Sequence, residues 1–137
     1  MRYTLFENRK DELLLVARIL LMILFLTFGG MKIADFSTTV TYMTSTGLPA
    51  PALATIIAVL MEFVVGIALL LGFYTRPLAI LLAFYTFATA LIGHPYWNMT
   101  GIDQYWGMIN FYKNISIVGG LLLLCITGPG RYSLDKR

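Results

Sequence analysis

The chain has 137 residues, of which 58% are hydrophobic and 12% charged, with a formal net charge of +3. Soluble globular domains carry about 25% charged residues, so this composition excludes an ordinary soluble domain. The basic residues gather at the ends of apolar segments, which indicates membrane topology, and we expect no nucleic-acid partner. The length predicts one domain over residues 1–137, and the single cysteine, Cys125, excludes an intrachain disulfide.

Four long apolar runs predict four transmembrane helices, at about 13–33, 52–73, 77–93 and 108–127. About 20 apolar residues are needed to cross the hydrocarbon core of a bilayer. The first run is predicted to be a retained helix and not a signal peptide, because Arg18 interrupts it and no small-residue cleavage site follows. The predicted fold class is an all-α integral membrane protein, a four-transmembrane-helix bundle.

Arg18, Met22, Phe25, Gly29 and Lys32 fall near one face of the first helix. The connection 34–51 contains apolar residues at helical spacing, which predicts a short interfacial helix between the first and second transmembrane helices. A tight turn around residues 74–77 joins the second and third helices. The connection 94–107 is predicted to be a loop whose Trp97, Tyr105 and Trp106 form an interfacial aromatic belt.

The distribution of basic residues predicts the orientation of the bundle. Positive charges concentrate on the cytoplasmic side of membrane proteins. We therefore predict a multi-pass protein with both termini in the cytoplasm and the connections 34–51 and 94–107 outside. The residues behind this prediction are Arg2, Arg9, Lys10, Arg18, Arg76, Arg131, Lys136 and Arg137.

Glu62 lies at the centre of the second apolar run. A carboxylate at that depth costs about 2.5 kcal/mol or more unless it is compensated. Ala58 and Gly66 share its helical face, so a neighbouring helix can approach closely. At 1.5 Å per residue, Arg18 and Lys113 are expected within about 7 Å of Glu62 in depth, on opposite sides. We predict that these two cations bracket the carboxylate.

A second group of polar residues is expected nearer the outer side. Asn110, Lys113 and Asn114 recur at helical spacing on one face of the fourth helix, which indicates a water-filled or ligand-filled cavity. The candidate site residues are Arg18, Lys32, Glu62, His94, Asn110, Lys113 and Asn114.

Structural alternatives stay open for several of these residues. In this alternative, Arg18 and Glu62 form an ion pair whose only role is to fix the register of the helices. Lys32 snorkels to the interface, and His94 is a surface or capping residue. One histidine, one cysteine and scattered carboxylates give no recognisable ligand set, so no metal site is predicted.

Seven short motifs in this order resemble the DoxX family of small four-helix membrane proteins. The resemblance covers essentially the whole chain and implies the same fold and a location in the bacterial inner (plasma) membrane. It also implies an association with redox processes, because the family includes subunits linked to quinol oxidation, thiosulfate metabolism and oxidative-stress complexes, although many members have no assigned activity. The motifs are Ala17-Arg18, Phe28-Gly-Gly-Met-Lys32, Gly47-Leu-Pro, Met61-Glu62, Leu71-Gly-Phe-Tyr-Thr-Arg-Pro77, Ile92-Gly-His94 with Tyr96-Trp97, and Asn110-Phe-Tyr-Lys113-Asn114.

These observations favour a redox-associated accessory subunit that binds a quinone or a similar lipid-soluble ligand. The sequence carries no haem, iron–sulfur or flavin signature, so we expect no intrinsic cofactor and at most a subunit of an oxidoreductase. A structural or assembly subunit of a membrane complex is the first alternative, and a small proton-coupled transporter the second. Besides the lipid bilayer, the expected partners are a second copy of the chain or a membrane or peripheral redox protein.

Overall fold

The computed structural model describes residues 5–136, and these form helices and turns without a strand. Arg2 and Arg137, which entered the predicted orientation, lie outside this range. Four helical segments are long and apolar enough to cross a membrane, which confirms the predicted fold class.

Six α-helices and three shorter helical turns make up the described chain. The first apolar segment is α1, and α2 is the short helix predicted between the first two spans. The second segment is one rod built from α3, a π-helical turn (η2) and α4. The bounds are η1 Glu7–Arg9, α1 Lys10–Ala34, α2 Phe36–Ser45, α3 Pro51–Val59, η2 Leu60–Val64, α4 Val65–Leu71, α5 Thr75–Gly93, η3 Tyr96–Asn98 and α6 Gly101–Thr127.

The loop predicted at 94–107 is shorter than expected. Helix α6 already begins at Gly101, so Tyr105 and Trp106 lie on its first turns. Aromatic residues can serve as interfacial anchors from a helix as well as from a loop, which explains why the aromatic belt was mistaken for a loop signal.

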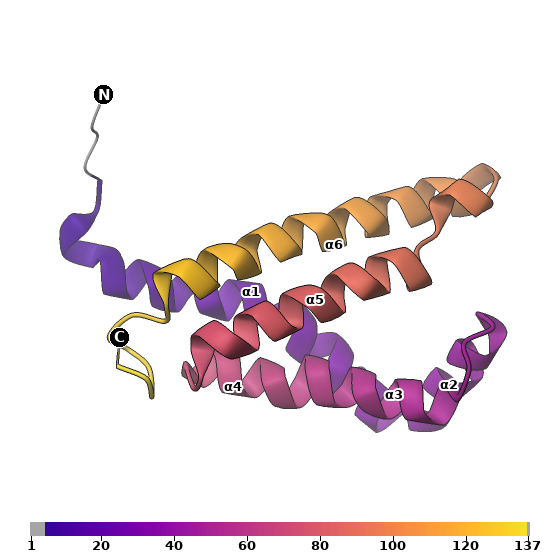
Figure 1. Cartoon of the computed structure of the whole chain (residues 1–137), viewed down its shortest axis with the longest axis horizontal. Helices are drawn as coiled ribbons and strands as arrows, with labels where there is room; N and C mark the ends of the chain where they lie inside the picture. The colour runs from indigo at the N-terminus through magenta and orange to yellow at the C-terminus, as the bar shows by residue number, and fades with distance from the viewer. Residues whose placement is uncertain (1–4, 137) are drawn as a thin grey trace.

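The helices pack as two units (Figure 1). Helix α1 packs against the α3–η2–α4 rod, and α5 packs along α6. The chain ends lie at one end of the molecule, which we term the terminal end (Figure 1). At the other end, the loop end, the α5–α6 connection and α2 are far apart, so the two units diverge there.

The apolar core occupies the terminal half of the bundle. Small residues let the helices approach closely, as is usual where lipid removes the hydrophobic drive between helices. The predicted face of α1 is confirmed, since Arg18, Met22, Phe25 and Gly29 are its buried residues. The core consists of Met22, Phe25, Leu69, Ala79, Leu82, Ala83, Leu121 and Leu124.

Gly72 ends the rod with a left-handed conformation, φ 71° and ψ 44°. The amides of Gly72 and Phe73 donate to the carbonyls of Leu69 and Ala68, at 3.1 and 2.8 Å, which is a Schellman cap. A Cβ on Gly72 would lie 2.1 Å from Arg18 Nη1 and 2.3 Å from Ser133 Cβ. Glycine is therefore required here for its conformation and for the close approach of α1 and the C-terminal segment.

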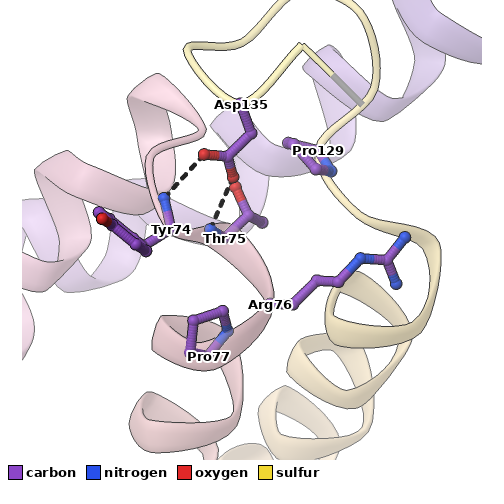
Figure 2. A pocket seen from close by; sticks show the side chains of 6 residues that line it. All are labelled: Tyr74, Thr75, Arg76, Pro77, Pro129 and Asp135. Atoms are coloured by element: carbon purple, nitrogen blue, oxygen red, sulfur yellow. Dashed lines mark hydrogen bonds between the residues drawn. The ribbon is translucent and has the colours of Figure 1, made fainter.

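Residues 128–136 return across the terminal end and close it. The amides of Leu134 and Asp135 donate to the carbonyls of Leu71 and Gly72, at 3.0 and 2.9 Å. The Asp135 carboxylate accepts from the amides of Tyr74 and Thr75, at 2.9 and 2.8 Å (Figure 2). The N-terminus of α5 is thus capped by a side chain from the far end of the sequence.

Candidate intramembrane polar site

Glu62 lies on the π-helical turn of the second segment and is 9% exposed. A π-helical turn holds one residue more than an α-helical turn and frequently occurs at functional sites. Ala58 and Gly66 are buried with Glu62, so the predicted shared face is confirmed. The face is directed at α1 and α5, which both contact η2.

Both oxygens of the Glu62 carboxylate are hydrogen-bonded. Lys32 Nζ donates to Oε1 at 2.7 Å, and the Tyr85 hydroxyl donates to Oε2 at 2.6 Å. We term these three residues, from α1, η2 and α5, the Glu62 triad. The side chains of Lys32 and Glu62 are only 23% and 11% exposed, so the pair is poorly screened by solvent. An ammonium and a phenol thereby offset the cost of the intramembrane carboxylate.

Gly29 allows α1 to come this close to the π-helical turn. A Cβ at this position would lie 2.9 Å from the backbone nitrogen of Phe63 and 3.1 Å from the carbonyl carbon of Glu62. These are backbone atoms and cannot rotate away. Lys32 follows Gly29 at i+3 on the same face, so the contact at Gly29 fixes the distance over which Lys32 reaches Glu62.

The predicted pairing of Arg18 with Glu62 is wrong. Arg18 is 1% exposed, and its Nη2 donates to the carbonyl oxygen of Tyr132 at 2.5 Å. Its side chain extends to the terminal end, against Gly72, and not toward the middle of the bundle. The prediction rested on depth along the helix axes, which does not give the direction in which a side chain extends. Arg18 therefore belongs to the closure of the terminal end.

Lys113, on α6, lies within electrostatic range of the Glu62 triad. Its charge interacts with those of both Lys32 and Glu62. Its Nζ lies 3.4 Å from Asn110 Oδ1, a long contact that leaves the ammonium donors weakly engaged. His94, half-buried at the end of α5, also lies within electrostatic range of Lys113. The structure thus brings Lys32, Glu62, His94, Asn110 and Lys113 into one region.

Asn114 differs from its neighbours on α6. It is 7% exposed, and its side-chain Nδ2 donates to Thr89 Oγ1 at 3.2 Å and to the Thr86 carbonyl at 3.4 Å. These contacts join α6 to α5. Asn114 therefore links α5 to α6. Its role differs from that of Lys113, although the two residues are adjacent in the sequence.

Neither Tyr85 nor the π-helical turn was predicted from the sequence. A signal for Tyr85 existed, because a phenol in the middle of an apolar run needs a hydrogen-bond partner. The π-helical turn has no comparable signal, since the run from Ala54 to Leu71 is apolar on all sides apart from Thr55 and Glu62. In the structure this turn lies in contact with α1.

Four apolar helical segments and a partly buried lysine–glutamate pair define a multi-pass helical membrane protein with an intramembrane polar site. Residues 13–95 match the DoxX family model. The match includes the whole Glu62 triad and His94, but ends before Asn110, Lys113 and Asn114.

Comparison with curated proteins extends the match to the complete chain. The inner membrane protein YphA of Escherichia coli is 54% identical over 137 residues, which cover all of this chain and 98% of YphA. The inner membrane protein YqjF of the same organism is 43% identical over 130 residues, covering 95% of each chain. An uncharacterized membrane protein of Mycobacterium tuberculosis, Rv3486, is 33% identical over 66% of this chain and 59% of its own. No solved structure matches the chain.

The chain belongs to the DoxX family and is an inner membrane protein. The resemblance noted in the sequence is therefore confirmed. YphA and YqjF are named for their location and not for an activity, so the chemistry of the site has to be argued from its geometry.

Adjacent glycines offer a matched test of the contact between α1 and the π-helical turn. We expect Gly29→Ala to destabilise the protein by about 1–3 kcal/mol, because its Cβ would collide with backbone atoms. Gly30→Ala is the control, since the nearest atom to its Cβ would be a Phe63 ring carbon at 3.8 Å. Thermal unfolding in detergent measures both variants, and equal melting temperatures would contradict the assigned contact.

A double-mutant cycle tests which cation pairs with Glu62. Lys32→Met and Glu62→Gln should show a coupling energy of about 0.5–3 kcal/mol, because the two side chains are in direct contact. Arg18→Met combined with Glu62→Gln should be additive within about 0.5 kcal/mol. Unfolding free energies in mixed micelles provide the measurement. Coupling confined to the Arg18 cycle would overturn the triad.

Proposed function

We propose that this protein is a redox-associated accessory subunit that binds a quinone or a similar lipid-soluble ligand beside the Glu62 triad. The observation that carries the proposal is the charge balance of the site. Two lysines on different helices, Lys32 and Lys113, interact with one carboxylate, Glu62. A net positive charge within a membrane-spanning region favours a ligand that presents electron-rich oxygen atoms.

Quinones fit this requirement because they dissolve in the bilayer and carry carbonyl oxygens that accept hydrogen bonds. Lys32 and Tyr85 already donate to Glu62. Lys113 has three ammonium donors and, among residues 5–136, only a long hydrogen bond with Asn110, so it is available as a donor to a carbonyl oxygen. Asn110 offers a second donor through its amide nitrogen.

A quinone would bring its own redox chemistry, so the protein needs only to position the ring and supply hydrogen-bonding groups. In this role the protein works with a second copy of itself or with a membrane or peripheral redox protein that exchanges electrons with the quinone. In this role the Glu62 triad stays in place and keeps the local charge constant while the ligand exchanges with the lipid.

A second candidate function is that of a structural or assembly subunit in a membrane complex. The observation in its favour is that both oxygens of Glu62 have partners within the chain. A carboxylate with a partner on each oxygen needs no ligand and can specify helix register alone. The two candidates differ in the role of Lys113, which is dispensable for the register of the triad but essential for a quinone.

Quinone binding can be measured through the tryptophans of the loop end. We expect decylubiquinone to quench the fluorescence of the purified protein saturably, and Lys113→Met to weaken binding by about tenfold, equal to about 1.4 kcal/mol for one hydrogen bond to a charged donor. The matched control is Lys10→Met, which removes the same charge from the first residue of α1, at the terminal end. Quenching that does not saturate, or equal affinities for both variants, would favour the structural role.

We further propose that both termini face the cytoplasm, which places Lys113 and His94 toward the outer side. Single cysteines on a Cys125→Ala background test this orientation, because Asn8 and Ser45 are exposed residues at opposite ends. An impermeant maleimide should label Ser45→Cys in intact cells and Asn8→Cys only after permeabilisation. The reverse pattern would show the opposite orientation.

A further inference from the structure

The polar site in the loop half carries more positive than negative charge. The charged side chains that act on one another there are Lys32, Glu62 and Lys113. Among residues 5–136, Glu62 is the only carboxylate whose charge acts on Lys113. His94 lies within range of Lys113, but an imidazole cannot supply a negative charge. The group therefore consists of two cations and one anion.

The single negative charge is already paired with Lys32. The Lys32 ammonium lies 2.7 Å from Glu62 Oε1, and the Tyr85 hydroxyl donates to Oε2 at 2.6 Å. Lys113 is repelled by Lys32 and attracted by Glu62, so the two influences on its charge oppose each other. Within residues 5–136, the charge of Lys113 is thus not balanced by a counterion of its own.

Lys113 lies where an unbalanced charge is costly. It precedes Asn114, the central residue of α6, and its side chain is partly buried. Asn110 accepts a hydrogen bond from it at 3.4 Å, but a neutral amide cannot balance a charge. Charged side chains within membrane helices pair with an opposite charge or mark a binding site. A ligand with a negative charge would supply the balance.

We propose that the site selects a lipid-soluble ligand in its singly negatively charged form, and that this ligand is a quinone with an acidic ring hydroxyl group. This inference rests on the proposed quinone site and specifies its ligand further. The deprotonated ring oxygen would accept from the Lys113 ammonium, and the adjacent ring carbonyl from the Asn110 amide nitrogen. The site would then hold two positive and two negative charges.

The number of charges on the ligand follows from the same balance. A neutral quinone offers only the partial charge of a carbonyl oxygen, and a hydrogen bond between two ions is stronger than one with a neutral acceptor. A low dielectric increases this difference. A ligand with two negative charges would exceed the balance and would be repelled by Glu62. Both considerations favour a monoanion.

Lapachol and its O-methyl ether test this preference on the unaltered chain, so the test does not depend on the folding of a variant. The two naphthoquinones share their ring and prenyl tail, but only lapachol has the acidic hydroxyl group. We expect lapachol to displace radiolabelled decylubiquinone from the purified protein at about tenfold lower concentration than the ether.

The outcomes separate this inference from the proposed function. Equal displacement by the two compounds, or stronger displacement by the ether, would overturn the charge preference and leave the quinone site in place. Labelled decylubiquinone that does not bind at all would overturn the proposed function, and this inference with it.

A variant assigns the preference to one ammonium group. Lys113→Met should bring the affinities of lapachol and the ether to within about twofold of each other. Lys10→Met is the matched control, because it removes the same charge from the first residue of α1, at the terminal end, and should keep the tenfold preference. A preference that persists in Lys113→Met, or disappears equally in Lys10→Met, would contradict the assignment.

A fatty acid is also a lipid-soluble monoanion, so laurate is the third competitor. Laurate carries the charge without the quinone ring, and we expect it to compete at least about tenfold more weakly than lapachol. If laurate competed as strongly as lapachol, the site would be a fatty-acid site and the assignment of a quinone would be overturned.

Discussion

The ion pair between Lys32 and Glu62 is the interaction on which the loop half of the bundle depends. The charge of a carboxylate inside a membrane has to be compensated, and the surrounding residues provide this compensation. Gly29 lets α1 approach, the π-helical turn presents Glu62, and Tyr85 brings α5 to the second oxygen. Three helices are therefore held together at one point by a single charged side chain. The terminal half relies instead on apolar packing.

Much of this arrangement could be predicted from the sequence, because its causes are local. Apolar runs of sufficient length predict the four helices, and Glu62 stands out as the one carboxylate at the centre of such a run. Its partner was misassigned because depth along parallel, straight helices leaves two directions open for a long side chain. Arg18 extends to the terminal end, and Lys32, nearer the end of α1, extends inward. Both side chains lean toward the N-terminus of α1, as side chains on an α-helix generally do, and the prediction did not include this direction.

The C-terminal segment was the least predictable part of the fold. Gly128-Pro129-Gly130 predicts the end of α6, but nothing in the residues that follow shows that they return to α4 and α5. Asp135 caps a helix that begins 60 residues earlier, a distance that no local pattern encodes. The same segment covers Arg18 and forms one wall of a cavity at the start of α5. The two halves of the molecule thus have separate chemistry. The Glu62 triad lies in the loop half, and the returning C-terminal segment closes the terminal end.

The π-helical turn at Leu60–Val64 has a consequence for how such chains can vary. It is equivalent to one residue inserted into an α-helix, and removing that residue would restore regular hydrogen bonding. The part of the rod beyond it would then rotate by about 100° about the helix axis, the angle of one α-helical residue. Glu62 and Leu69 could no longer both face the interior. A one-residue gap in this segment between related chains would therefore mark the loss of the intramembrane charge pair, even where lysine and glutamate are both retained.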